Sequence, residues 1–193
     1  MSQYLEAREK TIEKIEQAYF GLYIKERKIT VSEICKIAGI HRSTFYFYFE
    51  WVDDVLNGIK DRLYKKLTDI IDSEDRQKGD FRQIQINLRA MFKEERYYLI
   101  PLVLEQRGGK FAIQYRELIK ERFAEDLGID YKTGNDVKND VANCVLSGMI
   151  EIMLYELSSE IIPEEYTYII GRGIIDKGVL KTLKDDLNIK IGR

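Results

Sequence analysis

The chain has little of the residues on which most catalytic and metal sites depend. It holds one histidine, His41, and two cysteines, Cys35 and Cys144, among 193 residues. No cysteine and histidine group has the spacing of a metal site, and the GRG at residues 171–173 lacks the third glycine of a dinucleotide-binding loop. These absences argue against an enzyme, and the sequence implies neither a metal nor another cofactor.

Signals for export and for membrane insertion are also missing. The two cysteines lie far apart within helical patterns, so we expect buried thiols rather than a disulfide, which favours a reducing compartment. No stretch of about 20 apolar residues is present to span a membrane. The opening residues, MSQYLEAREK, lack the apolar core of a secretion signal. We therefore expect a cytoplasmic protein.

Prolines are scarce, and the charge is close to balanced. Only Pro101 and Pro163 interrupt the chain, which leaves room for long helices. The net charge is −2, and residues 1–50 contain 8 basic and 7 acidic residues. Any binding to nucleic acid must therefore come from local charge. Five basic residues do gather around one motif, and although such clusters are usually solvated surface, this placement favours a phosphate-binding role: Lys25, Arg27, Lys28, Lys36 and Arg42.

That motif is the segment 29–49, ITVSEICKIAGIHRSTFYFYF. Its first half has the start and stop signals of a short helix. Thr30 can cap the helix while Glu33 reaches back, as in a capping box. The positions of Ile34, Ile37 and Ala38 predict one buried face. Gly39 then ends the helix, because glycine accepts the left-handed conformation of a sharp turn.

A second short helix is expected over residues 41–48. Ile40 would fill the corner between the two helices, Phe45 would point inward, and Phe49 would close the end. Polar and aromatic groups are left facing outward near the start of this helix, where a DNA-recognition helix carries its base-reading residues. They are Arg42, Ser43, Tyr46 and Phe47.

Residue propensity alone favours a different structure for part of this segment. In residues 44–51, TFYFYFEW, every residue except Glu50 is of a type that is enriched in strands. Strands of RNA-binding sheets stack bases on such aromatic residues. However, no second strand candidate lies nearby, and the cap and glycine signals fit a pair of helices. We therefore expect the helix.

Residues 29–49 resemble the helix-turn-helix of the TetR family of bacterial transcriptional regulators. The family pattern joins a threonine cap to a helix ending in A-G-[VI], followed by a polar residue and x-x-T-[FL]-Y-x-[YH]-F. With the preceding helix, the motif covers about a quarter of the chain, and the rest matches only in length and all-helical layout. The matching positions are Ala38, Gly39, Ile40, Thr44, Phe45, Tyr46, Tyr48 and Phe49.

The resemblance implies roles for individual residues. It implies that Thr30, Thr44 and Tyr48 contact phosphates. It also implies that Arg42, Ser43 and Tyr46 face bases or the adjacent backbone, with Phe47 on the same outward side. Arg42 has the donors to bind guanine O6 and N7.

The chain departs from the family pattern just after the aromatic run. The family usually opens its next helix with a Ser or Asn cap and then a lysine that holds a phosphate. Trp51 and Val52 occupy those positions here. One phosphate anchor is therefore missing, and DNA affinity is expected to be low or to rely on other groups.

Helical periodicity continues to the end and predicts an all-α chain of about nine helices. We expect a three-helix DNA-binding headpiece at residues 1–50, opened by a helix over 4–26, and a ligand-binding and dimerisation domain at residues 51–193. Pro101 is expected to break or kink its helix. The helices expected in the second domain cover residues 52–72, 81–95, 97–107, 110–127, 135–157 and 163–187.

An aromatic-rich interior is expected in the second domain. Such a pattern by itself indicates a core. TetR-like proteins commonly hold an inducer there, so the resemblance implies an apolar ligand pocket, suited to a hydrophobic or aromatic small molecule. The candidate lining residues are Leu88, Phe92, Tyr97, Tyr98, Phe111, Tyr115, Cys144 and Tyr155.

The last two expected helices carry apolar residues on more than one face. Ordinary packing within the chain would explain them, but the family analogue is a four-helix bundle shared by two chains. A homodimer would also place two recognition helices about 34 Å apart, as two half-sites on DNA require. The candidate interface residues are Val145, Met149, Ile152, Tyr166, Ile170, Gly173 and Ile174.

The sequence thus predicts a homodimeric, DNA-binding transcriptional regulator. Repression, relieved by a small apolar or aromatic ligand, is the family default. The main alternative is a TetR-like co-activator that acts through a protein partner, which the valine at position 52 and the modest basic charge would fit. A third possibility is a small-molecule-binding protein or enzyme with a vestigial headpiece.

Overall fold

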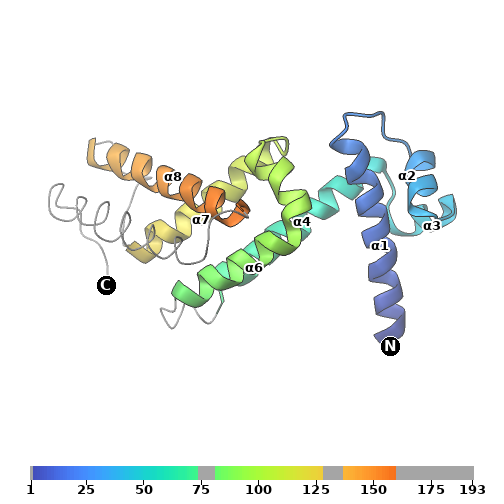
Figure 1. Cartoon of the computed structure of the whole chain (residues 1–193), viewed down its shortest axis with the longest axis horizontal. Coiled ribbons are helices and arrows are strands. Elements are labelled where there is room, and N and C mark those ends of the chain that lie inside the picture. Colours follow the sequence, from blue (N-terminus) through green and yellow to red (C-terminus); the bar gives the residue numbers. More distant parts are fainter. Residues whose placement is uncertain (1, 74–80, 128–136, 160–193) are drawn as a thin grey trace. The chain divides into compact units, whose positions relative to one another are not determined.

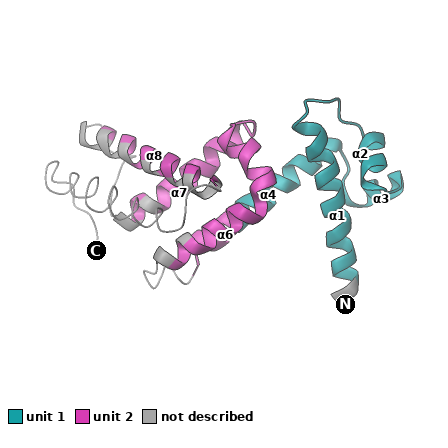
Figure 2. Cartoon of the chain, viewed as in Figure 1, with its two compact units in different colours: residues 1–66 teal, residues 67–193 magenta. Residues whose placement is uncertain are grey.

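The computed structural model describes residues 2–73, 81–127 and 137–159, and the statements below concern that part of the chain. All its regular elements are helices, and no strand occurs in the described part. The chain forms two compact units, residues 1–66 and 67–193. Figure 1 shows the helices and Figure 2 colours the two units. The boundary between the units falls within α4 (Val52–Ile71), so this helix contributes residues to both.

The first unit is built from α1 (Ser2–Tyr23), α2 (Val31–Ala38), α3 (Arg42–Tyr48) and the beginning of α4. Helix α1 packs against α2, and α2 packs against α3. Within the aromatic segment 44–51, which propensity favours as a strand, residues 44–48 are helical as part of α3. The buried core of this unit is formed by apolar side chains of all four helices, among them Ile15, Phe20, Ile34, Phe45, Val55 and Ile59.

Helix α1 ends at Tyr23, three residues before the expected end. Beyond it Glu26 adopts a left-handed conformation with φ 52°, and the Arg27 N–H donates to the Leu22 carbonyl over 3.2 Å. This six-to-one bond closes a helix in the manner of a Schellman turn. The sequence did not signal the end because glycine or asparagine usually occupies the left-handed position.

The second unit contains α6 (Phe81–Leu99), a π-helical turn (Ile100–Leu104), α7 (Lys110–Leu127) and α8 (Val137–Ser158). Helix α8 packs against α6 and α7, and the π turn contacts all three helices. The π turn therefore lies at the centre of this unit, and its Leu102 and Val103 are fully buried.

The expected break between residues 95 and 97 is wrong, because α6 continues without interruption to Leu99. Pro101 instead lies in the π turn, where the Glu105 N–H donates to the Ile100 carbonyl, five residues earlier, over 3.0 Å. A proline removes one helical hydrogen bond and crowds the preceding turn. The wider π turn is one of the recognised ways in which a helix absorbs such a local disruption.

Two glycines shape the connection from the π turn to α7. The Gly108 N–H donates to the Leu102 carbonyl over 3.0 Å. A Cβ atom at Gly108 would lie 2.6 Å from that carbonyl oxygen, and Gly109 has φ 57°. The close approach and the left-handed backbone therefore both require glycine here.

Polar contacts join the helices of the second unit. Arg116 Nε on α7 donates to Glu151 Oε1 on α8 over 2.6 Å, and Lys120 Nζ on α7 donates to Asn143 Oδ1 on α8 over 3.1 Å. None of the helices in the described ranges is long and apolar enough to cross a lipid bilayer. The helix expected over residues 163–187 lies outside the described residues.

Candidate functional site

The hydrogen bonds at both ends of α2 define a tight connection to α3. Thr30 has an extended backbone, and its hydroxyl accepts from the Glu33 N–H over 3.3 Å. The Glu33 carboxylate accepts from that same hydroxyl over 3.0 Å rather than from the Thr30 N–H expected in a capping box. At the other end Gly39 is left-handed, with φ 66° and ψ 38°, and donates to Cys35. The Thr30 cap and the Gly39 turn are thus confirmed, whereas the Glu33 carboxylate bonds to the Thr30 hydroxyl and not to the backbone.

One face of α3 is open to solvent. Arg42 and Ser43 are exposed, and the side chains of Tyr46 and Phe47 are 52% and 70% exposed. Their spacing over one helical turn brings all four onto the same side. Phe45 is fully buried beneath them, as expected. The helix therefore presents one guanidinium, one hydroxyl and two aromatic rings on a surface that Phe45 anchors.

The residues implied to contact phosphates are less exposed than those of this face. Thr44 and Tyr48 on α3 are half-buried, and so is Thr30 at the start of α2. The hydroxyl of Thr30 bonds to the backbone and the side chain of Glu33, so the main role of this side chain in the structure is to cap α2. The rings of Phe47 and Tyr48 meet edge to face, with centroids 5.0 Å apart.

The inner side of α2 differs from the expectation at one position. Ile37 is 57% exposed, whereas Ile34 and Cys35 are buried. Consecutive helical residues are about 100° apart, so a face centred on Ile34 and Cys35 leaves Ile37 toward solvent. Burial raises the pKa of the Cys35 thiol, and the positive charge of Arg42 lowers it in part. The expectation of a buried thiol is therefore confirmed for Cys35.

The start of α4 shows how the chain replaces the missing cap. The Trp51 N–H donates to Asp54 Oδ2 over 2.7 Å, which is the reach-back half of a capping box. Asp53 and Asp54 also place negative charge in the first turn, which the helix dipole favours. The same two carboxylates would repel a phosphate, so this helix start offers no replacement for a lysine at Val52. The signal for the cap was present, because Asp54 stands three residues after Trp51.

A cleft of about 480 Å³ lies beside α3 within the first unit. One face of α1 forms a wall of it, and the end of α3 and two residues of α4 form the rest. Between two of its lining residues, the Arg62 Nη2 donates to Glu16 Oε2 over 2.8 Å, which satisfies a buried carboxylate. The lining residues are Tyr4, Arg8, Ile12, Glu16, Phe47, Tyr48, Phe49, Gly58 and Arg62.

The predicted ligand-pocket residues of the second unit fall into two groups. Five of them are buried together in its interior: Leu88, Phe92, Tyr98, Phe111 and Tyr115. The Tyr115 ring lies 6.5 Å from that of Phe92 and 5.6 Å from that of Phe111, between centroids. The Tyr115 hydroxyl is buried without a hydrogen-bond partner in the described part of the chain. Burial raises its pKa well above the usual range, and the charge of Glu95 raises it further.

The other three pocket residues do not join this interior. Tyr97 is 44% exposed and Tyr155 is 66% exposed, and Cys144 is also exposed. All three are surface residues in the described part of the chain, and the expectation of a buried thiol is wrong for Cys144. Leu146, Ile150 and Leu154 form the inward face of α8, and Cys144 and Tyr155 lie outside that face. Because α8 carries apolar residues on more than one face, its sequence does not reveal which side packs.

The predicted interface residues are only partly visible. Ile152 is exposed on α8. The side chains of Val145 and Met149 lie outside the described residues, and so do Tyr166, Ile170, Gly173 and Ile174. Helix α8 thus carries Ile152, Tyr155 and Cys144 on its outer side in a single chain.

Comparison of the chain with protein-family models, curated proteins and solved structures finds no match. The described residues also hold no group of three or more His, Cys, Asp or Glu side chains that could bind a metal ion.

Proposed function

We propose that this chain is a DNA-binding transcriptional regulator of the TetR type, with α2, the turn at Gly39 and α3 as its helix-turn-helix. The observation that carries the proposal is the outward face of α3. Arg42, Ser43, Tyr46 and Phe47 are open to solvent, while Phe45 is buried beneath them. A recognition helix needs this division, because its exposed residues enter the major groove and its buried residues fix their orientation.

The exposed groups match the chemistry of base edges. The Arg42 guanidinium can donate two hydrogen bonds to guanine O6 and N7. The rings of Tyr46 and Phe47 provide apolar surface for a thymine methyl group. Thr44 and Tyr48 are half-buried on the same helix, and their hydroxyls can donate to phosphates. Such contacts fix the register of a helix on the duplex.

Regulation by a small ligand is the second part of the proposal. The Tyr115 hydroxyl in the aromatic interior of the second unit has no hydrogen-bond partner among the described residues, so it gives an apolar site one polar point of attachment. Helix α4 contributes residues to both units. A ligand that binds more tightly to one conformer of the second unit would shift the population of the headpiece conformer through this helix. We propose release from DNA, and hence relief of repression, as the outcome.

We further propose that the regulator is a homodimer formed through α8 and the segment that follows it. The exposed side chains of Ile152 and Tyr155 on α8 support an apolar contact with a second copy. A dimer also presents two recognition helices to two half-sites of an operator.

The first test is fluorescence anisotropy with DNA from just upstream of the gene, at about 50 and about 200 mM salt. We expect sequence-selective binding that weakens as salt increases. Arg42→Ala and Tyr46→Ala should reduce the preference for the selected sequence over a scrambled duplex, while Ile37→Ala, at an exposed position on α2, serves as the control. If no selected sequence from a genome-wide binding assay is preferred over random DNA, the proposal fails.

A second candidate function is that of a co-activator that binds a protein partner. The exposed apolar side chains of Ile37, Phe47 and Trp51 favour it, because aromatic residues are enriched at the centres of protein interfaces. Strong salt dependence separates the two functions, since phosphate contacts release counterions and an apolar protein interface does not.

A further inference from the structure

The cleft beside α3 contains two arginines in different states. Arg62 is engaged by the buried carboxylate of Glu16 at 2.8 Å, so their charges compensate each other. Arg8 lies on the same face of α1, two helical turns before Glu16, and is exposed. No side chain in the described ranges forms an ion pair or hydrogen bond with Arg8. Among the described residues, the positive charge of Arg8 is therefore not compensated by an ion pair.

The position of Arg8 is defined by the other walls of the cleft. Tyr48 and Phe47, at the end of α3, line it together with Arg8. These two residues belong to the proposed DNA-binding helix, and Phe47 is largely exposed. A DNA strand that follows the end of α3 would pass the exposed Arg8 guanidinium on α1 as well as Tyr48.

The same end of α3 is followed along the chain by a helix start whose charge does not suit phosphate binding. The first turn of α4 carries Asp53 and Asp54, with the Asp54 carboxylate bonded to the Trp51 N–H. Negative side chains there work against the attraction of the helix N-terminus for a phosphate. An anchor for the DNA backbone near the end of α3 must therefore come from another element.

We propose that Arg8 binds a backbone phosphate of the DNA and that the cleft between α1 and the end of α3 receives that strand. The guanidinium suits this role, because its planar set of N–H donors matches phosphate oxygens and is always charged. Arg8 thereby supplies the anchoring charge that α4 lacks. This inference rests on the proposed function. It gives α1, which lies outside the sequence motif, a part in DNA binding.

The test compares Arg8→Ala with Lys10→Ala by fluorescence anisotropy, on a selected operator and on a scrambled duplex. Lys10 is the matched control, because it is an exposed cation on the same helix and does not line the cleft. Arg8→Ala should weaken binding to both duplexes by a similar factor, on the order of fivefold to tenfold at low salt. The slope of log K against log salt should become shallower by about 0.9 per protomer. Lys10→Ala should change the affinity by less than about twofold.

Arg8→Lys adds a second readout. It keeps the charge and loses the fork of donors, so it should retain the salt slope and recover part of the affinity. Circular dichroism of the three variants should match that of the wild type, because both positions are exposed on α1.

The outcomes separate this inference from the proposed function. If wild-type protein binds DNA with salt dependence and Arg8→Ala leaves the slope and affinity unchanged, the role of Arg8 is overturned while the regulator function stands. An effect of Lys10→Ala equal to that of Arg8→Ala would also overturn it, since general charge would then explain both. If the wild type binds no DNA, both the function and the inference fail.

Discussion

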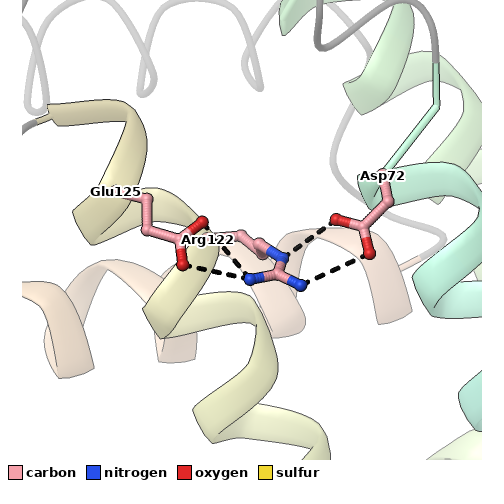
Figure 3. A network of polar contacts seen from close by, with 3 residues as sticks. All are labelled: Asp72, Arg122 and Glu125. Atoms are coloured by element: carbon pink, nitrogen blue, oxygen red, sulfur yellow. Dashed lines mark hydrogen bonds and ion pairs between the residues drawn. The ribbon is translucent and has the colours of Figure 1, made fainter.

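Arg122 on α7 donates to Asp72, which directly follows the last residue of α4, through two different nitrogens. The distance from Nε to Oδ1 is 2.9 Å and that from Nη2 to Oδ2 is 3.4 Å. The third nitrogen, Nη1, donates to both carboxylate oxygens of Glu125, at 3.0 and 3.3 Å. Figure 3 shows the guanidinium between the two carboxylates. This network ties α7 to the end of α4 within the second unit.

The two-nitrogen contact of Arg122 with Asp72 predicts a larger coupling energy than its one-nitrogen contact with Glu125. Double-mutant cycles with alanine should give a coupling energy of about 0.5–1 kcal/mol between Arg122 and Asp72, because both residues remain partly exposed. The coupling to Glu125 should be about 0.3 kcal/mol, typical of a pair within one helix. Urea unfolding provides the free energies. Equal coupling to both carboxylates would show that the fork adds nothing.

If α4 transmits an effector signal, the same pair gives a functional readout. Arg122→Ala should leave DNA affinity without effector within about twofold, and it should reduce the shift that an effector causes. A variant that lost DNA affinity itself would point to a general loss of stability instead.

Features encoded by neighbouring residues could be predicted from the sequence. The cap at Thr30, the left-handed Gly39 and the buried Phe45 each follow from local chemistry, and the bounds of α7 agree with the expected 110–127. Such features depend on residues within one helical turn, where spacing and residue type largely decide the structure.

Features that depend on distant residues could not be predicted. Glu16 and Arg62 are 46 residues apart, and Arg122 and Asp72 are 50 apart, so no periodic pattern joins them. The inclusion of Arg8 in the cleft depends on how α1 lies against α3 and α4. For α8, apolar residues on more than one face leave the choice of the packed side to the tertiary structure, in which Tyr155 is exposed.

Two glycine substitutions should have opposite effects on stability. Gly108→Ala should destabilise the protein by about 2–3 kcal/mol, because its Cβ would lie 2.6 Å from the Leu102 carbonyl oxygen and the backbone must shift. Gly58 lies inside α4, where alanine favours the helix more than glycine does, and its Cβ would meet Phe49 at an ordinary 3.7 Å. Gly58→Ala should therefore stabilise the protein by about 0.5–1 kcal/mol. Thermal and urea unfolding test both. A neutral Gly108→Ala would contradict the close approach at the π turn.

Alkaline pH should weaken the first unit through Tyr19. Burial raises the pKa of Tyr19 to about 12, with smaller contributions from the charges of Asp53 and Tyr23. In the unfolded chain a tyrosine titrates near pH 10. The folded state therefore holds the proton over the interval from about pH 10 to about pH 12, and stability falls as pH rises through it, by at most about 1.4 kcal/mol per pH unit.

Tyr19→Phe isolates this contribution from that of other titrating groups. Between about pH 8 and about pH 11, urea stability of the wild type should decrease more than that of Tyr19→Phe. Tyr4→Phe, at an exposed position on the same helix, is the control and should follow the wild type. Parallel curves for the wild type and Tyr19→Phe would rule out the linkage.

The Tyr115 hydroxyl should contribute nothing favourable to the stability of the second unit. It is fully buried between Phe92 and Phe111, and it has no hydrogen-bond partner among the described residues. A buried polar group without a partner loses its hydration and gains no bond in return. Tyr115→Phe should therefore leave stability unchanged or raise it by up to about 1 kcal/mol. Tyr115→Ala should lower it by about 3–5 kcal/mol through the cavity that it creates.

Urea unfolding of the two variants distinguishes the ring from its hydroxyl. A loss of more than about 1 kcal/mol in Tyr115→Phe would show that the hydroxyl is hydrogen-bonded in the folded protein. If Tyr115→Phe retains stability, the Tyr115 hydroxyl contributes nothing to folding and is available to bind a ligand. In that case Tyr115→Phe should also weaken the response to an effector that needs this hydroxyl, while DNA binding without effector stays as in the wild type.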